Sequence, residues 1–381
     1  MIEFPIFLDN HSTTKVDDRV IEVMLPYFTK YYGNAASRQH SFGWHSDIAV
    51  ENSRKIISQF INCEPSEIIF TSGSTESNNL ALKGILQNSK KHFITCVTEH
   101  PSIIDVANYL EKNGIEVTYL TVNKFGEINL DEFKNAIKDN TLLVSLMAVN
   151  NEIGTIHNIE AIGKICKEKK VLFHTDATQG IGKIKIDLKK MNIDLMSFSS
   201  HKIYGPKGVG ALYVKKNVNL IPLFHGGGHE KKNRSGTLNV SGIVGFGKAI
   251  DIFSQNMEEE NLRIKNLQQM LYQNILEKIQ NIWLNGSFEN RVTNNLNIGI
   301  ENIDANHVMM QMKEVAISTG SACASISSQE SHVLKAIGLS KNKIHSSIRF
   351  GIGRFNTEEE INYVTNKLSE VGKKIKNNFK N

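Results

Sequence analysis

Long apolar runs are missing from this sequence of 381 residues. No hydrophobic stretch approaches the roughly 18–20 residues that a membrane-spanning helix requires, and the opening segment MIEFPIFLDN lacks the pattern of a secretory signal peptide. Internal repeats and low-complexity segments are missing as well. We therefore expect a cytoplasmic protein without a membrane partner.

Cysteine is scarce: the four residues show no paired metal-ligand spacing, so no metal site is expected, and no secretory context argues for disulfide bonds. Cys96 lies in a strand-like run, Cys166 in a helical pattern and Cys63 at an apolar helix end. All three are expected to be small buried residues. Cys323 differs, because it stands in ISTGSACASISSQES, a stretch of small residues that is typical of a surface loop or a flexible arm.

A strong charge of either sign is also absent. The 44 lysines and arginines are opposed by 39 acidic residues, and the resulting charge of +5 is dispersed along the chain. This balance does not argue for binding to nucleic acid. With 40% hydrophobic and 22% charged residues the composition is that of an ordinary globular protein, and the length favours two lobes over one core.

Seven short apolar runs alternate with helical patterns between about residues 60 and 215. The runs are EIIFT, HFITCV, IEVTYL, TLLVSLM, VLFHTD, DLMSFS and VGALYV. This alternation predicts an α/β fold with a seven-stranded, mainly parallel sheet that is covered on both faces. Because ligands bind beyond the carboxyl ends of such strands, the loops GSTES, TEHPS, NNEIG, DATQ and SSHK are expected to converge on one edge.

A long helical pattern begins near Val240 and continues through EEENLRIKNLQQMLYQNILEKIQ. It is expected to connect the large sheet to a smaller α+β unit. That unit contains the strand-like segments LNIGI and SSIRFGIGRF and the stretch around Cys323.

Two residues at the ends of strand-like runs predict a pyridoxal phosphate site. Asp176 ends the run VLFHTD, and Lys202 follows the run DLMSFS. A pyridoxal phosphate site needs both, because the lysine amine forms a Schiff base with the cofactor aldehyde and the carboxylate keeps the pyridine nitrogen protonated. A lone lysine after a strand is usually a solvated surface residue, but serines, a histidine and a Gly-Pro step crowd this one.

The segment TSGSTES offers a place for the cofactor phosphate. Gly73 allows a tight turn, and Ser74 and Thr75 offer hydroxyl and backbone N–H donors at a helix start, which is a ready anion site. A plain helix cap with a glutamate capping box explains the same pattern equally well. The remaining donors of a phosphate shell are Ser199, His201 and Thr237.

Two further side chains are candidates for contacts with the cofactor ring. The Gln179 amide lies one turn beyond Asp176, where it could reach the phenolic oxygen. His100, at a strand end in VTEHPS, could stack on the ring and move protons. An isolated histidine in such a place is more often a hydrogen-bonded structural residue.

The carboxylate of an amino-acid substrate needs a fixed partner with two donors. Arg349 is the best candidate, because an arginine between apolar residues of a strand does not serve solubility. Asn151 could add a hydrogen bond to the same carboxylate, and Arg354 and Arg234 are weaker alternatives to Arg349.

Ordered motifs extend over nearly the whole chain: FLDNHSTT, GNAASRQHSFGW, FTSGSTESNNLA, TEHPS, VNNEIGT, HTDATQ, MSFSSHKIYGPKGVGALYV, HGGGHEKKNRSGTLN, GSACAS and HSSIRFGIGRF. In these motifs the chain resembles the group I cysteine desulfurases, pyridoxal phosphate enzymes of the class-V aminotransferase family that serve iron–sulfur cluster assembly. The resemblance implies a fold-type I aminotransferase architecture, with a large domain over residues 13–258 and a small domain over residues 1–12 and 259–381. It also implies a homodimer in which Thr237 reaches the partner subunit's phosphate.

The resemblance implies a reaction with L-cysteine as well. The substrate displaces Lys202 from the aldehyde, Lys202 removes the Cα proton, and His100 assists the proton transfers. The Cys323 thiolate then attacks the substrate sulfur, alanine leaves, and the persulfide on Cys323 passes to an iron–sulfur scaffold protein or another sulfur acceptor such as a tRNA-thiolation protein. A selenocysteine lyase, or another lyase of the same fold, is the alternative; it would need Lys202 but no protein persulfide.

Three positions depart from the pattern of that family. Lys15 in HSTTKVDD stands where a proline commonly follows the threonines, which changes a turn residue. Ser200 stands where glycine is common, so the phosphate loop is expected to lie slightly differently. The sequence ends at KNNFKN, without the longer extension by which some members grip a scaffold, so weaker docking or docking through other surfaces is expected.

Overall fold

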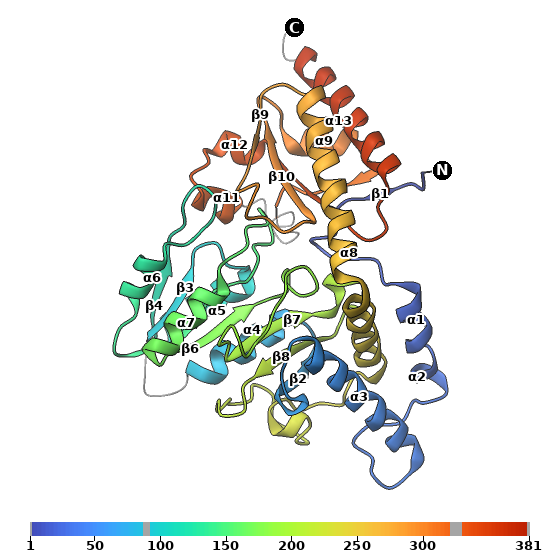
Figure 1. Ribbon diagram of the computed structural model, residues 1–381, viewed down its shortest axis with the longest axis vertical. Helices are drawn as coiled ribbons and strands as arrows, with labels where there is room; N and C mark the ends of the chain where they lie inside the picture. The colour runs from blue at the N-terminus through green and yellow to red at the C-terminus, as the bar shows by residue number, and fades with distance from the viewer. Residues whose placement is uncertain (1, 87–91, 321–329, 379–381) are drawn as a thin grey trace.

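The computed structural model describes residues 2–86, 92–320 and 330–378. A large sheet with its helices occupies the lower half of the molecule, and a smaller sheet with helices occupies the upper half (Figure 1). Helix α8 (Val240–Lys278) extends along one side and connects the two, as the helical pattern predicts. Within the described part of the chain, no helix combines the length and the apolar character that crossing a membrane requires.

The seven predicted strands form one sheet. They are β2 (Ile68–Thr71), β3 (His92–Cys96), β4 (Glu116–Leu120), β5 (Thr141–Ser145), β6 (Leu172–Asp176), β7 (Leu195–Ser199) and β8 (Gly210–Val214), in the spatial order β2-β8-β7-β6-β5-β3-β4. Strand β8 is antiparallel to both its neighbours, and the other pairs are parallel. The predicted α/β fold with a seven-stranded, mainly parallel sheet is therefore confirmed.

Successive residues of the strands enter different cores, because side chains alternate between the two faces of a sheet. Phe70 and Met196 belong to the core on one face, together with residues of α3 and α8, whereas Ile69 and Leu195 belong to the core on the other face. Both faces are thus covered, which explains why the strands read as continuous apolar runs.

Helices of the large unit cover the two faces of this sheet or pack against α8. They are α1 (Asp18–Met24), α2 (Pro26–Thr29), α3 (Ser41–Phe60), α4 (Ser74–Leu86), α5 (Pro101–Lys112), α6 (Leu130–Ala136) and α7 (Ile159–Lys169), with 3-10 turns η1 (Pro65–Glu67), η2 (Ser200–Lys202) and η3 (Glu230–Lys232). Helices α4 and α5 contribute to one core, and α3, α7 and the first half of α8 contribute to the other. Helices α1 and α2 pack against α8.

The small unit has its own apolar core. Its antiparallel sheet has the order β12-β10-β9, and a short parallel pair joins the N-terminal strand β1 to β11. The bounds are β1 (Ile6–Phe7), β9 (Ile282–Leu284), β10 (Asn295–Ile300), β11 (Val315–Ala316), β12 (Ser347–Gly351), α9 (Ala305–Gln311), α11 (His332–Ala336), α12 (Lys341–His345) and α13 (Glu358–Asn378). Buried residues of α8, α13, β10 and β12 pack together in this core, and Ile6 and Leu8 join them from the N-terminus.

Two of the cysteine predictions are confirmed and one is wrong. Cys96 in β3 and Cys166 in α7 are buried. Cys63 is only partly buried, because it follows the end of α3 and precedes η1 in a surface turn.

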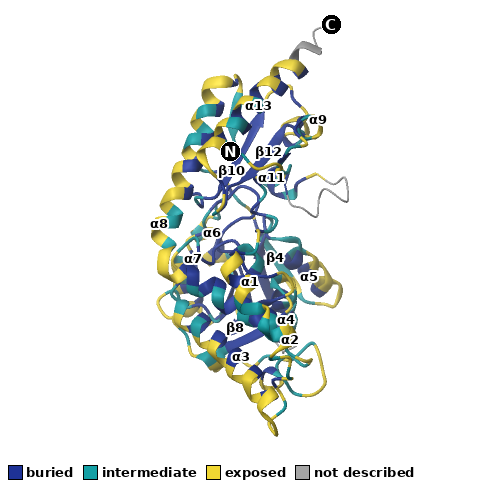
Figure 2. Cartoon of the chain, turned by 90° about the vertical axis from the view of Figure 1, so that its right-hand side faces the viewer, coloured by how far each residue is buried: buried dark blue, intermediate teal, exposed yellow. Residues whose placement is uncertain are grey.

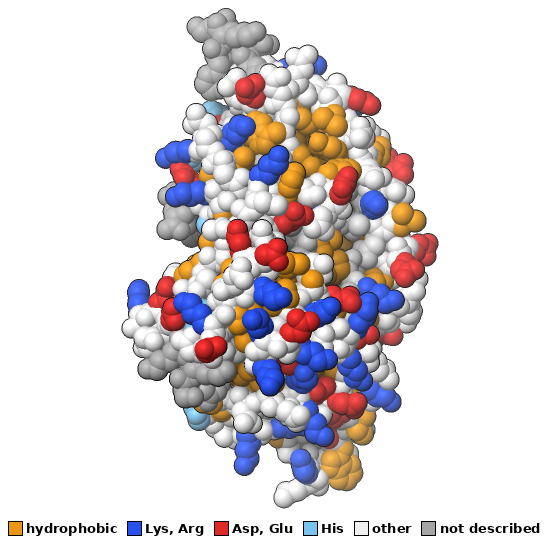
Figure 3. Space-filling view, turned by 60° about the vertical axis from the view of Figure 1, so that its left-hand side comes forward, with side chains coloured by type: hydrophobic (Ala, Val, Ile, Leu, Met, Phe, Trp, Pro, Cys, Tyr) orange, Lys and Arg blue, Asp and Glu red, His pale blue; other side chains and the backbone are white. Residues whose placement is uncertain are grey.

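The outer surface carries charges of both signs. Exposed residues line the outer sides of α3, α8 and α13 (Figure 2). On the face shown in Figure 3, lysine and arginine side chains gather over the lower half, and acidic side chains lie among them. The small positive surplus of the sequence is therefore interspersed with negative charge on this face.

Candidate active site

One cavity of about 230 Å³ collects most of the predicted site residues. Its lining comprises His11, Ser12, Ser74, Thr75, His100, Met147, Val149, Asn151, Asp176, Thr178, Gln179, His201, Lys202 and Arg349. Three predicted residues are not among them. Ser199 is buried at the end of β7, Thr237 is exposed beyond η3, and Cys323 lies outside the described residues.

Asp176 and Lys202 reach the cavity from neighbouring strands. Asp176 is the last residue of β6, and Lys202 ends the turn η2 that follows the next strand in the sheet, β7. The Lys202 ammonium donates to the carbonyl oxygens of His11 and Ser12 at 2.5 and 2.6 Å. The carboxylate of Asp176 accepts from Asn78 Nδ2 at 2.8 Å and from the Thr178 N–H at 2.9 Å, so its orientation is fixed.

The start of α4 combines a helix cap with a place for an anion. Gly73 adopts φ +155°, a value that favours glycine, and Ser74 and Thr75 follow it into the first turn beside the cavity. The Glu76 carboxylate reaches back to the Ser72 N–H at 2.7 Å. This contact is the glutamate side of the predicted capping box, and the N–H groups of the first turn have no helical acceptors.

Both predicted histidines are held by hydrogen bonds, and their surroundings favour the neutral ring. His100 Nδ1 accepts from the Ser102 N–H at 3.1 Å, so the proton of the neutral ring lies on Nε2. Burial, with Lys202 nearby, lowers the pKa of His100, although Asp176 acts in the opposite direction. Burial and then the charge of Lys202 lower the pKa of His201 to about 3.

Arg349 in β12 is the cation of the small unit that reaches the cavity. Its guanidinium donates to the Asn151 carbonyl at 2.9 Å and to Asp9 Oδ1 at 2.8 Å, and its side chain is 1% exposed. The two weaker alternatives are engaged elsewhere: Arg234 pairs with Glu76, and Arg354 pairs with acidic residues outside the cavity. Arg349 is thus the arginine of the three that lines the site.

The sequence alone does not single out several residues that shape the cavity. Asn78 holds Asp176, and its only signal is its position four residues after Ser74, which places both on one helical face. The His11 carbonyl accepts from Lys202 and from Gln179 Nε2. A backbone acceptor leaves no trace in the residue pattern, so the motif DNHSTT gave no sign of this contact.

The residues of the cavity fit pyridoxal phosphate. Asn151 Oδ1, Thr178 Oγ1 and Arg349 Nε are buried in or beside the cavity without hydrogen-bond partners, which is a costly arrangement unless a bound group satisfies them. An amine, a carboxylate one strand away and the N-terminus of a helix surround the same space. These are the groups that an aldehyde, a pyridine nitrogen and a phosphate require.

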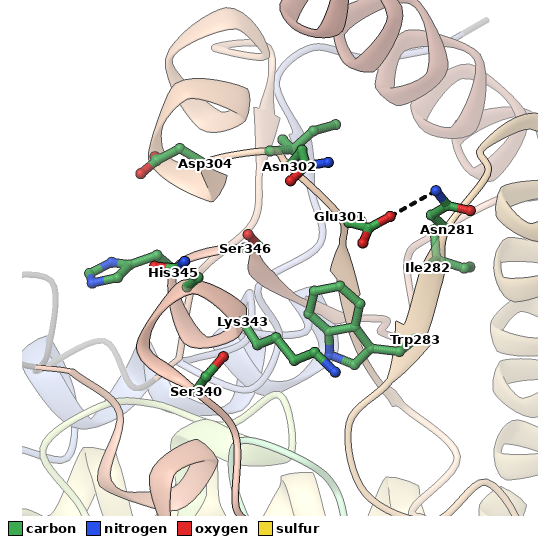
Figure 4. A pocket seen from close by; sticks show the side chains of 12 residues that line it. Asn281, Ile282, Trp283, Glu301, Asn302, Asp304, Ser340, Lys343, His345 and Ser346 are labelled. Atoms are coloured by element: carbon green, nitrogen blue, oxygen red, sulfur yellow. Dashed lines mark hydrogen bonds between the residues drawn. The ribbon is translucent and has the colours of Figure 1, made fainter.

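A larger hollow of about 910 Å³ lies elsewhere, on the small unit (Figure 4). Asn281 Nδ2 donates to Glu301 there at 2.7 Å, and Lys343 Nζ lies 5.1 Å from the centroid of the Trp283 ring. Its lining contains none of the buried side-chain atoms that lack a partner. The smaller cavity around Lys202 is therefore the better candidate for chemistry.

Comparison with known proteins agrees with this geometry. The Aminotransferase class-V family matches residues 6–364. A protein described as cysteine desulfurase IscS from Methylobacillus flagellatus is 49% identical over 379 residues, covering 98% of this chain and 93% of the relative.

Solved structures show the same likeness. A structure described as a NifS-like protein superposes with a TM-score of 0.91 at 35% identity, covering 96% of this chain and 98% of the other. A structure described as SspA in complex with cysteine has a TM-score of 0.83 at 36% identity, covering 92% of this chain and 100% of the other. The chain belongs to the aminotransferase class-V family and, within it, to the cysteine desulfurases.

Proposed function

We propose that this chain converts L-cysteine to L-alanine in the cavity around Lys202 and leaves the sulfur as a persulfide on Cys323. The convergence of Lys202, Asp176 and Arg349 on one cavity carries the proposal. The names of its relatives support cysteine as the substrate.

Pyridoxal phosphate, when bound, supplies the electron sink that makes the Cα–H of the amino acid acidic. The chain contributes the groups that hold it: Lys202 for the aldehyde, Asp176 for the pyridine nitrogen, Gln179 for the phenolic oxygen, and the start of α4 with His201 for the phosphate. Ser199 and the partner subunit's Thr237 complete the phosphate donors of this proposal.

The remaining residues orient the substrate and move protons. Arg349 Nε is placed to donate to the substrate carboxylate, because it is a buried donor at the cavity without a partner. The side-chain NH₂ group of Asn151, which lines the same cavity, is proposed to donate to the carboxylate as well. The Lys202 amine takes the Cα proton. His100 carries its proton on Nε2 and can exchange it with the substrate, since Nδ1 is engaged with Ser102.

Sulfur leaves through Cys323. Its thiolate attacks the substrate sulfur, so a sulfur–sulfur bond forms while the carbon–sulfur bond breaks. The electron pair of the broken bond stays with the carbon fragment, which takes up protons and departs as alanine. We propose an iron–sulfur scaffold protein as the acceptor of the persulfide, with a tRNA-thiolation protein as a second acceptor, on the resemblance to desulfurases of cluster assembly.

Product analysis tests this proposal directly. The purified protein, loaded with pyridoxal phosphate and treated with L-cysteine, is expected to form alanine and to gain one sulfur on Cys323, as measured by peptide mass spectrometry. Treatment with L-alanine is the control and should add no sulfur. Formation of alanine with no added mass on Cys323 would contradict the persulfide step.

We further propose that the chain forms a homodimer through an apolar surface on α1–α3. Seven large hydrophobic side chains with 40% to 65% exposure lie on these helices and their connections, and groups of exposed apolar side chains mark interaction sites. They are Ile21, Leu25, Phe28, Tyr32, Phe42, Trp44 and Ile48. The exposed Thr237 would reach the partner subunit's cavity across the same interface.

The double substitution F28E/W44E is expected to convert the dimer to a monomer. Two carboxylates in an apolar interface should weaken association by at least about a hundredfold, which sedimentation velocity measures. The matched control is Tyr109→Glu, since Tyr109 is 52% exposed on α5, away from α1–α3. A double variant that remains dimeric would place the interface elsewhere.

We also propose the division into residues 13–258 and residues 1–12 with 259–381. Two observations support it. The helix α8 has a non-helical residue, Asn256 (φ −136°), close to the boundary. In addition, Ile6 and Leu8 from the N-terminus pack in the core of the small unit.

We also propose a cytoplasmic location, which the unpaired state of Cys63, Cys96 and Cys166 supports.

A further inference from the structure

Lys183 lies next to the cavity without a role in the reaction described above. Its ammonium donates to Gln179 Oε1 at 2.8 Å. The other end of the same amide, Nε2, donates to the His11 carbonyl at 2.9 Å, and that carbonyl also accepts from Lys202. A continuous set of hydrogen bonds thus connects Lys183 to Lys202 through Gln179 and His11.

Lys183 is a partly buried lysine with a second cation, Lys202, close by. No acidic residue in the described ranges forms an ion pair with it. Desolvation, followed by repulsion from Lys202, lowers the pKa of Lys183 from 10.5 to about 7. The nearby imidazoles of His11 and His201 feel its charge too, and their pKa values are lowered. A lysine that is hydrogen-bonded to a residue of the cavity and lies close to a second cation is a candidate for a functional use.

We propose that Lys183 is a positioning residue for the cofactor site, holding the Gln179 amide oxygen and, in its protonated form, placing a positive charge close to Lys202. This inference rests on the proposed roles of Gln179 and Lys202. The two ends of an amide are alike in size, so only their partners fix which end faces the cavity. With Oε1 held by a cation, the NH₂ group is the end left for His11 and for an anionic oxygen of a bound cofactor.

The charge of Lys183 has a second effect, which gives the proposal a distinctive readout. A nearby positive charge disfavours the protonated form of a neighbouring nitrogen. Removing it should therefore raise the pKa of the Lys202 nitrogen in the cofactor-loaded protein. That titration is visible in the absorbance of the bound cofactor and requires no turnover.

Lys183→Met is expected to raise the pKa of this absorbance change by about half a unit or more. Lys183→Arg, which keeps the charge, should return it to the parent value. Lys185→Met is the matched control, because Lys185 is exposed on the same segment and should have no effect. Lys183→Gln serves as a second neutral variant should the methionine variant fail to fold.

The outcomes separate this inference from the proposed function. A folded neutral variant that titrates as the parent does, or an arginine variant that shifts as the methionine variant does, would overturn the positioning role and leave the desulfurase proposal intact. A parent protein that shows no cofactor absorbance would instead overturn the proposed site, and this inference with it.

Discussion

Lys202→Ala is expected to lose L-cysteine turnover by at least about a thousandfold and to lose the visible absorbance of lysine-bound cofactor. The reason is that a single atom, Lys202 Nζ, takes part in two steps of the reaction. Nζ forms the bond to the cofactor aldehyde and later accepts the Cα proton, so no neighbouring group can replace it. Another lysine close by, Lys183, is hydrogen-bonded to Gln179 and does not line the cavity.

The experiment compares absorbance spectra and alanine formation in the parent, in Lys202→Ala and in a control. Lys207→Ala is that control, because Lys207 is exposed a few residues along the same segment. Circular dichroism of the three proteins serves to check that the variants are folded. Turnover of cysteine at the parent rate by Lys202→Ala would refute the assignment of this lysine.

The sequence predicts the strands of this fold well but not their arrangement. All seven runs are strands, and most of them read as apolar runs because both faces of the sheet are covered; the edge strand β4, which begins at the exposed Glu116, is the most polar of them. The reversed direction of β8 is not visible in residue types, since side-chain alternation is the same for either direction. Only the short connection after β7 hints at it, because a parallel crossover needs more residues.

Some residues of the candidate site were likewise predictable from the sequence, and others were not. Asp176, His100 and Lys202 were predictable, because polar residues directly after buried strands meet at one edge of the sheet. His11 was not, because it enters from the N-terminal segment, which is held in place by pairing of β1 with β11 and by contacts with Gly351 in β12. Such contacts join residues that are distant in sequence, and no local pattern records them.

Cys323→Ala is expected to keep the cofactor absorbance and the binding of L-cysteine but to lose alanine formation by at least about a hundredfold. Substrate binding depends on Lys202 and Arg349, which the substitution leaves untouched. Only the acceptor of the sulfur is removed, so the reaction stops before the carbon–sulfur bond breaks. The measurement records the absorbance change on adding L-cysteine and, separately, the alanine released.

The other cysteines cannot replace Cys323 as the acceptor of the sulfur, so the prediction depends on Cys323 alone. Burial raises the pKa of the Cys96 thiol to about 11 and, with Glu67 and Glu64 nearby, that of Cys63 to about 12; burial also raises the pKa of Cys166. A thiol that stays protonated at neutral pH is a poor nucleophile. Cys63→Ala, the matched control at a partly exposed thiol, should therefore turn over cysteine like the parent. Sulfide production at the parent rate by Cys323→Ala would instead mean that sulfur leaves by elimination, as in a lyase, with no protein persulfide on the path.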